Sequence, residues 1–507
     1  MTTHRHIDKI CIIITVLALV VTSVFMVSDR LGVKKVVDED AEGKENVSGF
    51  TSKDMDGDWD SSDATVITLN GDDAKIKGQG AYVLDGSVYI TGAGYYAVSG
   101  ELTDGSIYVD AYDSSKVWIL LDGVNINRID SAAIYVKQAE KVFLTLADGS
   151  TNTLKSGANY SDEALNDGAG GVIYTHDDLT INGTGSLDIT AEYKHGIESN
   201  DSLVITGGKI TVTAPEDGFH VNDEVNITEA DITIHASDDG IHSDTSFLMA
   251  SGSLYIDECY EGIEALTIDI IDGNIEIYCT DDGMNANGGS SDFGFGGGFG
   301  DGGFGGGRPD GEMPDMTDMP TPPDGEMPDG ELPDMTEMPT PPDGEMPQTA
   351  DKTKNQSEDD TFDEDAESWI HISGGSIYIE NDTARDADGL DSNGDIIITG
   401  GELWITLPGD GSNCAIDYGS ESGGVCEING GNVIACGSSS MVEDASSSST
   451  QCNILYIPGS IVSAGTTVSL KDEEGNTLLE WEVPNSFSAV TLSHPDLKIG
   501  STYTIVT

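Results

Sequence analysis

Acidic residues recur in this sequence directly before glycines at a regular spacing, and a histidine holds the same position in the first copy. The residues in this position are His195, Asp217, Asp239, Glu261, Asp282, Asp388 and Asp410. If the repeat forms stacked strands, equivalent side chains lie about 4.8 Å apart. Carboxylates at that distance repel one another unless protons or a cation intervene. Calcium suits such a site because it accepts about six to eight oxygen ligands in loose geometry. The pattern therefore predicts a ladder of carboxylates that binds calcium.

The expected metal ligands come from this ladder and from polar residues beside it. They are Glu216, Asp217, Asn222, Asp238, Asp239, Asp244, Glu261, Asp281, Asp282 and Asp388. The alternative interpretation is a series of solvated Asp-Gly turns, which need no ion.

Two histidines extend the series of side chains that could do chemistry. His220 and His242 each stand two positions after a repeat glycine, and Glu198 and Glu264 hold the same position in the flanking copies. Stacking would place these four side chains in one row. The row is either a transition-metal site or sugar-facing groove, or a hydrogen-bonded surface ladder without a ligand.

Catalytic patterns are scarce. A lyase acting on an acidic polysaccharide would need a Lys or Arg to abstract the C5 proton of a uronate, with calcium raising the acidity of that proton. Between residues 172 and 287 the only Lys or Arg residues are Lys194 and Lys209, and Lys194 adjoins the acidic series. Lys194 is the sole candidate base, and no other catalytic residue is predicted.

The same glycines define a repeat of about 22 residues, and this repeat must position the acidic groups. An apolar residue follows each of the first six glycines: Ile197, Phe219, Ile241, Ile263, Met284 and Leu390. Apolar pairs two positions apart, such as Ile210 and Val212, predict strands with one buried face. Three short strands per repeat predict an all-β chain folded as a parallel β-helix, with stacked coils around a continuous apolar core. We expect this fold over residues 66–287 and 367–452, and a β cap over 453–507.

One interval of the repeat is much longer than the others. Gly283 and Gly389 lie 106 positions apart, and residues 288–366 between them are rich in Gly, Pro, Met and acidic residues. Almost no β-branched residue in this segment is available for burial. We predict a disordered insertion, which is either a spacer arm or a tolerated low-complexity expansion.

The N-terminal region predicts export. An uninterrupted apolar run from Ile10 to Val27 is long enough to cross a bilayer, and Arg5 and Lys9 precede it. We expect a cytoplasmic segment at 1–9, a transmembrane anchor or cleaved signal peptide at 10–27, and an acidic linker at 28–65. The remainder is then extracellular and touches the membrane only through the N-terminal segment.

The charge balance restricts the partners. With 22 basic and 91 acidic residues, the formal net charge is −69. Such a chain repels nucleic acid, and a polyanionic partner requires a bridging cation. We expect a monomer.

Several motifs together resemble a known family. The stretch from Val88 to Tyr112, the segments VWILLDGVNI, LADGSTNTL and LTINGTGSLDI, and the DGI and DGF copies of the repeat resemble the bacterial carbohydrate-binding domain-containing proteins. The resemblance covers about residues 66–507 apart from the insertion. It implies a right-handed parallel β-helix similar to that of pectate lyases, bound calcium, and binding of plant-type polysaccharides, especially acidic ones.

The sequence therefore predicts calcium-dependent binding of polysaccharide at the cell surface, with galacturonan-like or other plant-type glycans as the partners. A calcium-dependent, pectate-type polysaccharide lyase and a structural or adhesive surface protein are the alternatives.

Overall fold

The computed structural model describes residues 49–58, 63–287, 368–382 and 386–507. The segments expected at 1–9 and 10–27 and the insertion expected at 288–366 lie outside these ranges. Within them, no helix is long and apolar enough to cross a membrane.

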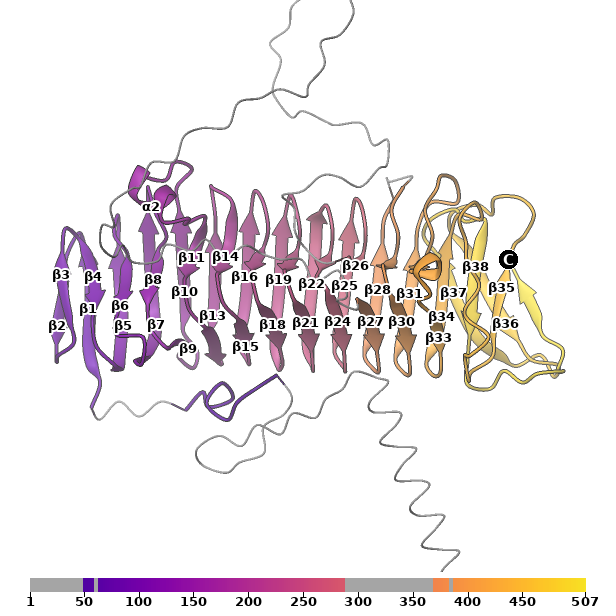
Figure 1. Ribbon diagram of the computed structural model, residues 1–507, viewed down its shortest axis with the longest axis horizontal. Coiled ribbons are helices and arrows are strands. Elements are labelled where there is room, and N and C mark those ends of the chain that lie inside the picture. The colour runs from indigo at the N-terminus through magenta and orange to yellow at the C-terminus, as the bar shows by residue number, and fades with distance from the viewer. Residues whose placement is uncertain (1–48, 59–62, 288–367, 383–385) are drawn as a thin grey trace, which may run out of the picture. The chain divides into compact units, whose positions relative to one another are not determined.

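Most of the described chain consists of three ladders of short, mainly parallel strands. Within each ladder, the strands are stacked in the order in which they occur along the chain (Figure 1). The first ladder comprises β3 (Ala81–Leu84), β4 (Ser87–Ile90), β6 (Ile107–Asp110), β8 (Ile134–Gln138), β11 (Gly171–Thr175), β14 (His195–Ser199), β17 (Phe219–Val221), β20 (Ile241–Ser243), β23 (Ile263–Glu264), β26 (Met284–Ala286), β29 (Leu390–Ser392) and β32 (Ile416–Tyr418). The second comprises β9 (Lys141–Leu146), β12 (Leu179–Gly183), β15 (Leu203–Ile205), β18 (Glu224–Ile227), β21 (Ser246–Met249), β24 (Thr267–Ile270), β27 (Trp369–Ile372), β30 (Asp395–Ile398) and β33 (Cys426–Ile428). The third comprises β10 (Thr151–Ser156), β13 (Ser186–Thr190), β16 (Lys209–Ala214), β19 (Ala230–Ala236), β22 (Gly252–Cys259), β25 (Asn274–Cys279), β28 (Ser376–Glu380), β31 (Glu402–Thr406) and β34 (Asn432–Gly437).

Longer and antiparallel strands close the two ends of the ladders. At the N-terminal end these are β1 (Thr65–Gly71), β2 (Ala74–Lys77), β5 (Gly94–Leu102) and β7 (Lys116–Arg128), and β7 pairs with both β9 and β10. At the C-terminal end, β35 (Asn453–Tyr456) and β38 (Ala489–Ser493) run antiparallel, while β36 (Thr466–Lys471), β37 (Thr477–Val483) and β39 (Thr504–Val506) form a separate sheet. Among the residues that the structure describes, the helical elements are α2 (Asp162–Asn166) and η1 (Ser420–Ser422). The expectation of an all-β chain is confirmed to this extent: the described part is nearly all β, with almost no helix.

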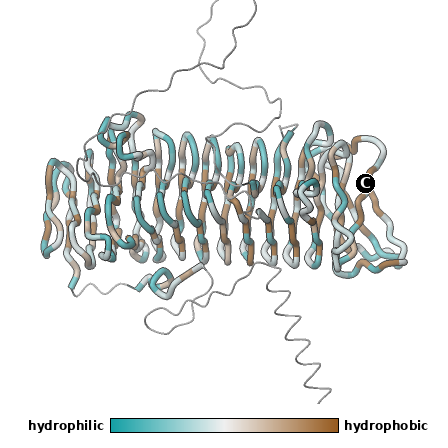
Figure 2. Tube along the Cα trace, in the orientation of Figure 1, coloured by the Kyte–Doolittle hydropathy of each residue, from teal (hydrophilic) through white to brown (hydrophobic). Residues whose placement is uncertain are grey.

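The predicted apolar columns form the core. Phe219 pairs with Ile241, and Ile241 with Ile263, and all three are fully buried. In the third ladder the pairing of Ile210 with Ile232 repeats this arrangement. Because side chains alternate between the two faces of a strand, each buried column has an outward neighbour. Hydrophobic positions accordingly recur from coil to coil (Figure 2).

Strand pairing continues across the long interval. β25 pairs with β28 and β26 pairs with β29, so residues on either side of 288–367 occupy adjacent rungs of the ladders.

The expected last copy of the repeat is wrong. Leu390 pairs with Ile416, and the Gly389 N–H donates to the carbonyl of Cys414. Cys414, and not Asp410, therefore follows Asp388 in the series. The two residues are 26 positions apart, whereas Asp217 follows His195 after 22. Because this coil is longer than 22 residues, the glycine 22 positions after Gly389, which is Gly411, does not hold the equivalent position in the ladder.

Part of the expected linker packs against the ladders. Asp54 is 1% exposed, its Oδ1 accepts a hydrogen bond from Thr180 on β12, and it lies 3.0 Å from Lys141 Nζ. Asn182 donates to the carbonyls of Asp54 and Asp56. Residues 49–58 are thus held by polar contacts to the second ladder.

The repeat glycines are required by close packing. A Cβ on Gly240 would lie 2.4 Å from Ile256 Cγ2 and 2.6 Å from the carbonyl oxygen of Gly262 on the next coil. The alanine could be accommodated only if the ladder backbone moved. The recurrence of glycine at this position from Gly196 to Gly389 therefore has a steric reason.

We expect Gly240→Ala to lower the free energy of unfolding by about 1–3 kcal/mol, since it overpacks a filled site. Chemical denaturation measures the change. Gly92→Ala is the control, because the nearest contact of its Cβ is 3.7 Å. Equal stabilities for the two variants would contradict the packing account.

Candidate functional site

One outward-facing column runs along the whole first ladder, and we call it the outer column. Strand pairing places its members one above another in the order Tyr82, Tyr89, Tyr108, Tyr135, Tyr174, Glu198, His220, His242, Glu264, Asn285, Asp391 and Asp417. On β17 the alternation is plain, because Phe219 and Val221 are buried while His220 is partly exposed. The strand periodicity that builds the core therefore also builds this polar row.

The carboxylates before the repeat glycines border the outer column. Several of them accept a hydrogen bond from the backbone of the next coil: Asp239 N–H donates to Asp217, Asp388 N–H to Asp282, and Cys414 N–H to Asp388. An Asp here satisfies a backbone donor that the turn leaves free. This structural role accounts for part of the acidic series without any ion.

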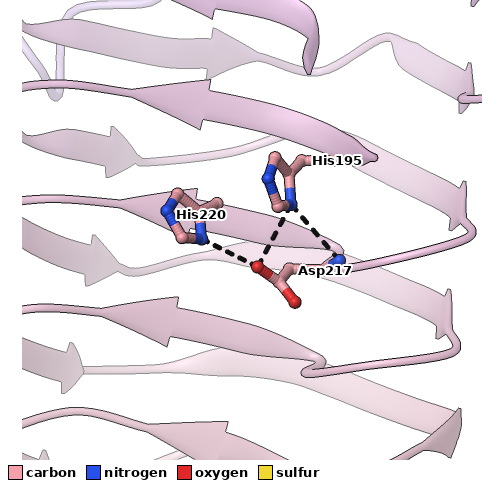
Figure 3. Close-up of side chains that lie close together, drawn as sticks. All are labelled: His195, Asp217 and His220. Carbon is pink, nitrogen blue, oxygen red and sulfur yellow. Dashed lines mark hydrogen bonds and ion pairs between the residues drawn. The ribbon is translucent and has the colours of Figure 1, made fainter. Parts of the chain in front are cut away.

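The first group of close polar side chains is the histidine cluster, formed by His195, Asp217 and His220 (Figure 3). Asp217 Oδ2 lies 3.1 Å from His195 Nδ1 and 2.7 Å from His220 Nδ1, and the two imidazole rings stack at 4.4 Å. Burial opposes ionisation of Asp217, but the hydrogen bonds with His195 and His220 outweigh it and hold the pKa of this carboxyl well below its usual range. Asp217 therefore has protein partners for its charge.

The second group is the mixed cluster of Asp239, His242 and Glu264. His242 Nδ1 lies 2.5 Å from Glu264 Oε2 and 3.5 Å from Asp239 Oδ2, while its Nε2 lies 3.1 Å from Asp244 Oδ1. Burial would lower the pKa of His242, but the carboxylates raise it to about 12. The side chain is therefore a buried imidazolium that compensates acidic neighbours from its own coil and from the next one.

The third group is the carboxylate cluster of Asp388, Asp391 and Asp417, whose oxygens lie within 4.8 Å of one another. Asn287 Nδ2 donates to Asp391 at 2.8 Å. Burial, followed by the neighbouring Asp417 and Asp391, raises the pKa of Asp388 to about 8. Burial likewise raises the pKa of Asp391 and of Asp417.

The charge of the column is compensated unevenly along its length. No Lys or Arg occurs between residues 210 and 287 or between 386 and 470. The first two clusters use imidazoles instead, but the carboxylate cluster contains none. Two adjoining acids also have raised pKa values. Burial is the main cause and neighbouring carboxylates add to it, so that the pKa of Glu261 is raised to about 10 and that of Asp282 to about 8.

The donor atoms decide which ion each cluster fits. Calcium prefers carboxylate, amide and carbonyl oxygens, whereas imidazole nitrogens suit zinc and other transition metals. The carboxylate cluster, with Asp282 on the preceding coil, offers oxygen donors and therefore fits calcium. In the other two clusters, imidazole nitrogens already contact the carboxylate oxygens.

The other residues expected from the sequence are less concentrated. Glu216 Oε2 lies 3.7 Å from Lys194 Nζ and 3.8 Å from His195 Nε2. Glu261 accepts a hydrogen bond from Asn285. Asn222 and Asp238 are exposed and belong to none of the three clusters. Asp281 is partly exposed and interacts with Tyr260.

Lys194, the expected candidate base, forms an ion pair at the surface. Its side chain is 41% exposed, and its Nζ lies 3.7 Å from the Glu216 carboxylate. Its backbone has a φ of 43°, in the left-handed region.

The sequence interpretation missed Asp391 and Asp417. Asp391 stands two residues after a repeat glycine, as His220 and Glu264 do, and Asp417 holds the equivalent position two residues after Ala415. The repeat pattern alone would therefore have predicted Asp391. It could not have predicted Asp417, because the coil that contains Asp417 has a different length.

Comparisons with known proteins support the family resemblance. Residues 84–286 match the family model described as carbohydrate-binding domain-containing protein. A protein of that description from Acetivibrio thermocellus is 43% identical over 136 residues, which are 27% of this chain and 48% of that relative. The chain thus spans about half the length of this relative. The resemblance is confirmed for this part of the chain.

A solved structure is also similar in sequence. It is a polysaccharide lyase-like protein from C. thermocellum, in a gadolinium derivative, with 33% identity over 44% of this chain and 88% of the other. The TM-score is 0.38, so the superposition carries no argument about fold or site.

We expect His242→Gln to lower the free energy of unfolding by about 3 kcal/mol at pH 6, because it leaves buried carboxylates without their cation. The raised pKa means that the His242 contribution is fully present below about pH 6.5 and declines as pH rises toward 12. Protonation of Glu264, whose pKa is lowered, removes the contribution at acidic pH. The difference between the variant and the original chain is therefore largest near pH 6.

His235→Gln is the matched control, because this histidine pairs with Asp257 on the third ladder and its side chain is 36% exposed. Its cost should stay below about 1 kcal/mol. Denaturation curves at several pH values measure both variants. Equal losses for the two, or a loss for His242→Gln that does not vary with pH, would argue against a buried imidazolium.

Proposed function

We propose that this chain is an extracellular polysaccharide-binding protein, and that calcium at the carboxylate cluster bridges it to acidic, galacturonan-like glycans. One observation carries the calcium part of the proposal: Asp388, Asp391 and Asp417 converge within 4.8 Å, and no Lys or Arg occurs between residues 386 and 470. The descriptions of the family model and of the relative from A. thermocellus support carbohydrate as the partner.

Electrostatics explains why a cation belongs in this function. A chain of net charge −69 and a polyuronate repel each other across any shared interface. A divalent ion bound by Asp388, Asp391 and Asp417 supplies positive charge to both surfaces and accepts oxygen ligands from either one. Asp282 is the further carboxylate ligand that the preceding coil offers.

We also propose that the three ladders form one right-handed parallel β-helix with coils of about 22 residues. The support is the repeated order of strands from the three ladders along the chain, together with the strong general preference for right-handed crossovers between parallel strands. Such coils present the outer column as one continuous row. The histidine and mixed clusters then hold the middle of the row together without an added ion.

An extracellular location and an N-terminal anchor at 10–27 complete the proposal. They rest on the apolar run and on the preceding basic residues. Binding is preferred to a lyase reaction because Lys194 lies in a surface ion pair with Glu216.

The test compares the original chain with a double variant that combines Asp391→Asn and Asp417→Asn. Calcium should raise the melting temperature of the original by several degrees and should permit binding to polygalacturonate in a pull-down. Chelator should abolish both effects, and the double variant should lose most of each, since it removes two of the three carboxylate charges.

A double variant of Glu276→Gln and Glu402→Gln is the control, because it removes the same charge from the third ladder. It should behave as the original chain does. Full polygalacturonate binding in chelator, or an unchanged calcium response in the Asp391 and Asp417 double variant, would falsify the bridging role. Formation of unsaturated uronate products would instead support a lyase.

A further inference from the structure

The N-terminal third of the outer column differs chemically from the rest. Its five members are tyrosines, and successive ring centroids lie 5.2, 4.9, 5.2 and 5.1 Å apart from Tyr82 to Tyr174. The first two pairs stack with interplanar angles of 7° and 10°. Where the later coils present charged groups, these coils present aromatic rings with a hydroxyl at the tip.

The helix α2 covers one end of the tyrosine row. Ala164 of α2 packs with Tyr135, Tyr160 and Tyr174 in a small apolar cluster. The Tyr135 hydroxyl donates to the Asp167 carboxylate and the Tyr174 hydroxyl to the Asp167 carbonyl. α2 is therefore fixed on the first ladder, beside β8 and β11 (Figure 1). Tyr135 and Tyr174 are buried beneath it, while Tyr82 is 47% exposed.

A cleft of about 560 Å³ lies between α2 and the exposed part of the row. This volume is within the range of roughly 300–1,000 Å³ that is typical of small-molecule sites. Tyr89, Tyr108 and Tyr135 line it, together with Arg128 and Lys137. Because packing and hydrogen bonds fix α2, the cleft is formed before any ligand arrives.

The charges of the lining favour an uncharged ligand. Two basic residues, Arg128 and Lys137, face four acidic ones: Asp85, Asp110, Glu163 and Asp167. Arg128 is already paired with Asp130 at 2.7 Å and with Asp104 at 3.7 Å. An anionic sugar would therefore meet a surplus of carboxylates. A neutral sugar could instead donate its hydroxyls to these carboxylates and lay its C–H groups against the tyrosines.

Buried polar atoms at the cleft wall also lack partners. Ser131 is 2% exposed, and neither its Oγ nor Arg128 Nε has a hydrogen-bond partner within the part of the chain that the structure describes. Buried polar groups of this kind are normally satisfied. Both residues belong to the lining of the cleft.

We propose that this tyrosine cleft is a second glycan subsite, which takes neutral sugar residues and works without calcium. The inference rests on the proposed function in one respect, namely that the ligand of the chain is a polysaccharide. The cleft and the carboxylate cluster lie on the same ladder, and the seven strand steps from β8 to β29 separate them by roughly 34 Å. One long polysaccharide could contact both sites, which would strengthen its binding without any new contact.

The experiment titrates the full chain with three neutral hexasaccharides, cellohexaose, xylohexaose and maltohexaose, by calorimetry in chelator. At least one should bind, and calcium should change its affinity less than twofold. Tyr108→Ala should weaken that binding at least tenfold. A double variant of Asp110→Asn and Lys137→Ala changes only exposed residues of the cleft, and it should weaken hexasaccharide binding at least threefold. This variant keeps the test valid if Tyr108→Ala fails to fold.

Tyr255→Ala is the control, because it removes a tyrosine from the third ladder. The affinity of this variant for the neutral hexasaccharides should match that of the original chain. No binding of any of the three probes, or equal affinity in all cleft variants, overturns the subsite. So does a loss of neutral-sugar binding in the Asp391 and Asp417 double variant. Polygalacturonate binding in calcium is measured in parallel: its retention without neutral-sugar binding refutes the cleft alone, and the converse refutes only the calcium bridge.

Discussion

Parallel stacking in constant register is the constraint on which the rest of this structure depends. A strand repeated at about 4.8 Å places each side chain above its own equivalent. For apolar residues this is favourable, and Phe219, Ile241 and Ile263 form a filled core column. For carboxylates the same register places like charges together, where burial prevents water from screening them. Each segment of the outer column is a different solution to that problem.

The outer column has three segments, which differ in the chemical type of their side chains. Tyrosines avoid the charge problem in the first coils, and their rings stack. In the middle coils, imidazoles lie among acids, so that His242 contacts the carboxylates of Asp239 and Glu264 and Asp217 contacts two histidines. In the last coils only carboxylates and amides remain. The proposed calcium site therefore lies in the last coils, and the aromatic cleft lies in the first ones.

The sequence alone was sufficient to predict those features that repeat. The glycine column, the buried residues after it and the row containing His220 and His242 all follow from a 22-residue period, and the structure contains them. The acidic positions from Asp217 to Asp388 recur in the folded chain, but spacing could not show that Asp217 is paired with histidines whereas Asp388 is not. That difference depends on neighbouring coils and on burial, which only the folded chain provides.

Features that break the period were not predictable in the same way. Asp417 was missed because its coil has additional residues, and Asp410 was wrongly placed for the same reason. The tyrosine row was hidden because its coils vary in length: Ile134 pairs with Ile173 across the segment that contains α2. The docking of Asp54 against Thr180 joins residues 126 positions apart, and no local pattern indicates such a contact.

The central claim is that the carboxylate cluster requires a cation from outside the protein. Crystals of the chain grown with calcium and measured for anomalous scattering test it most directly. The account predicts an anomalous peak at about 2.3–2.6 Å from oxygens of Asp388, Asp391 and Asp417, the usual calcium–oxygen distance. Well-ordered carboxylates at these three residues with no peak between them would contradict the account.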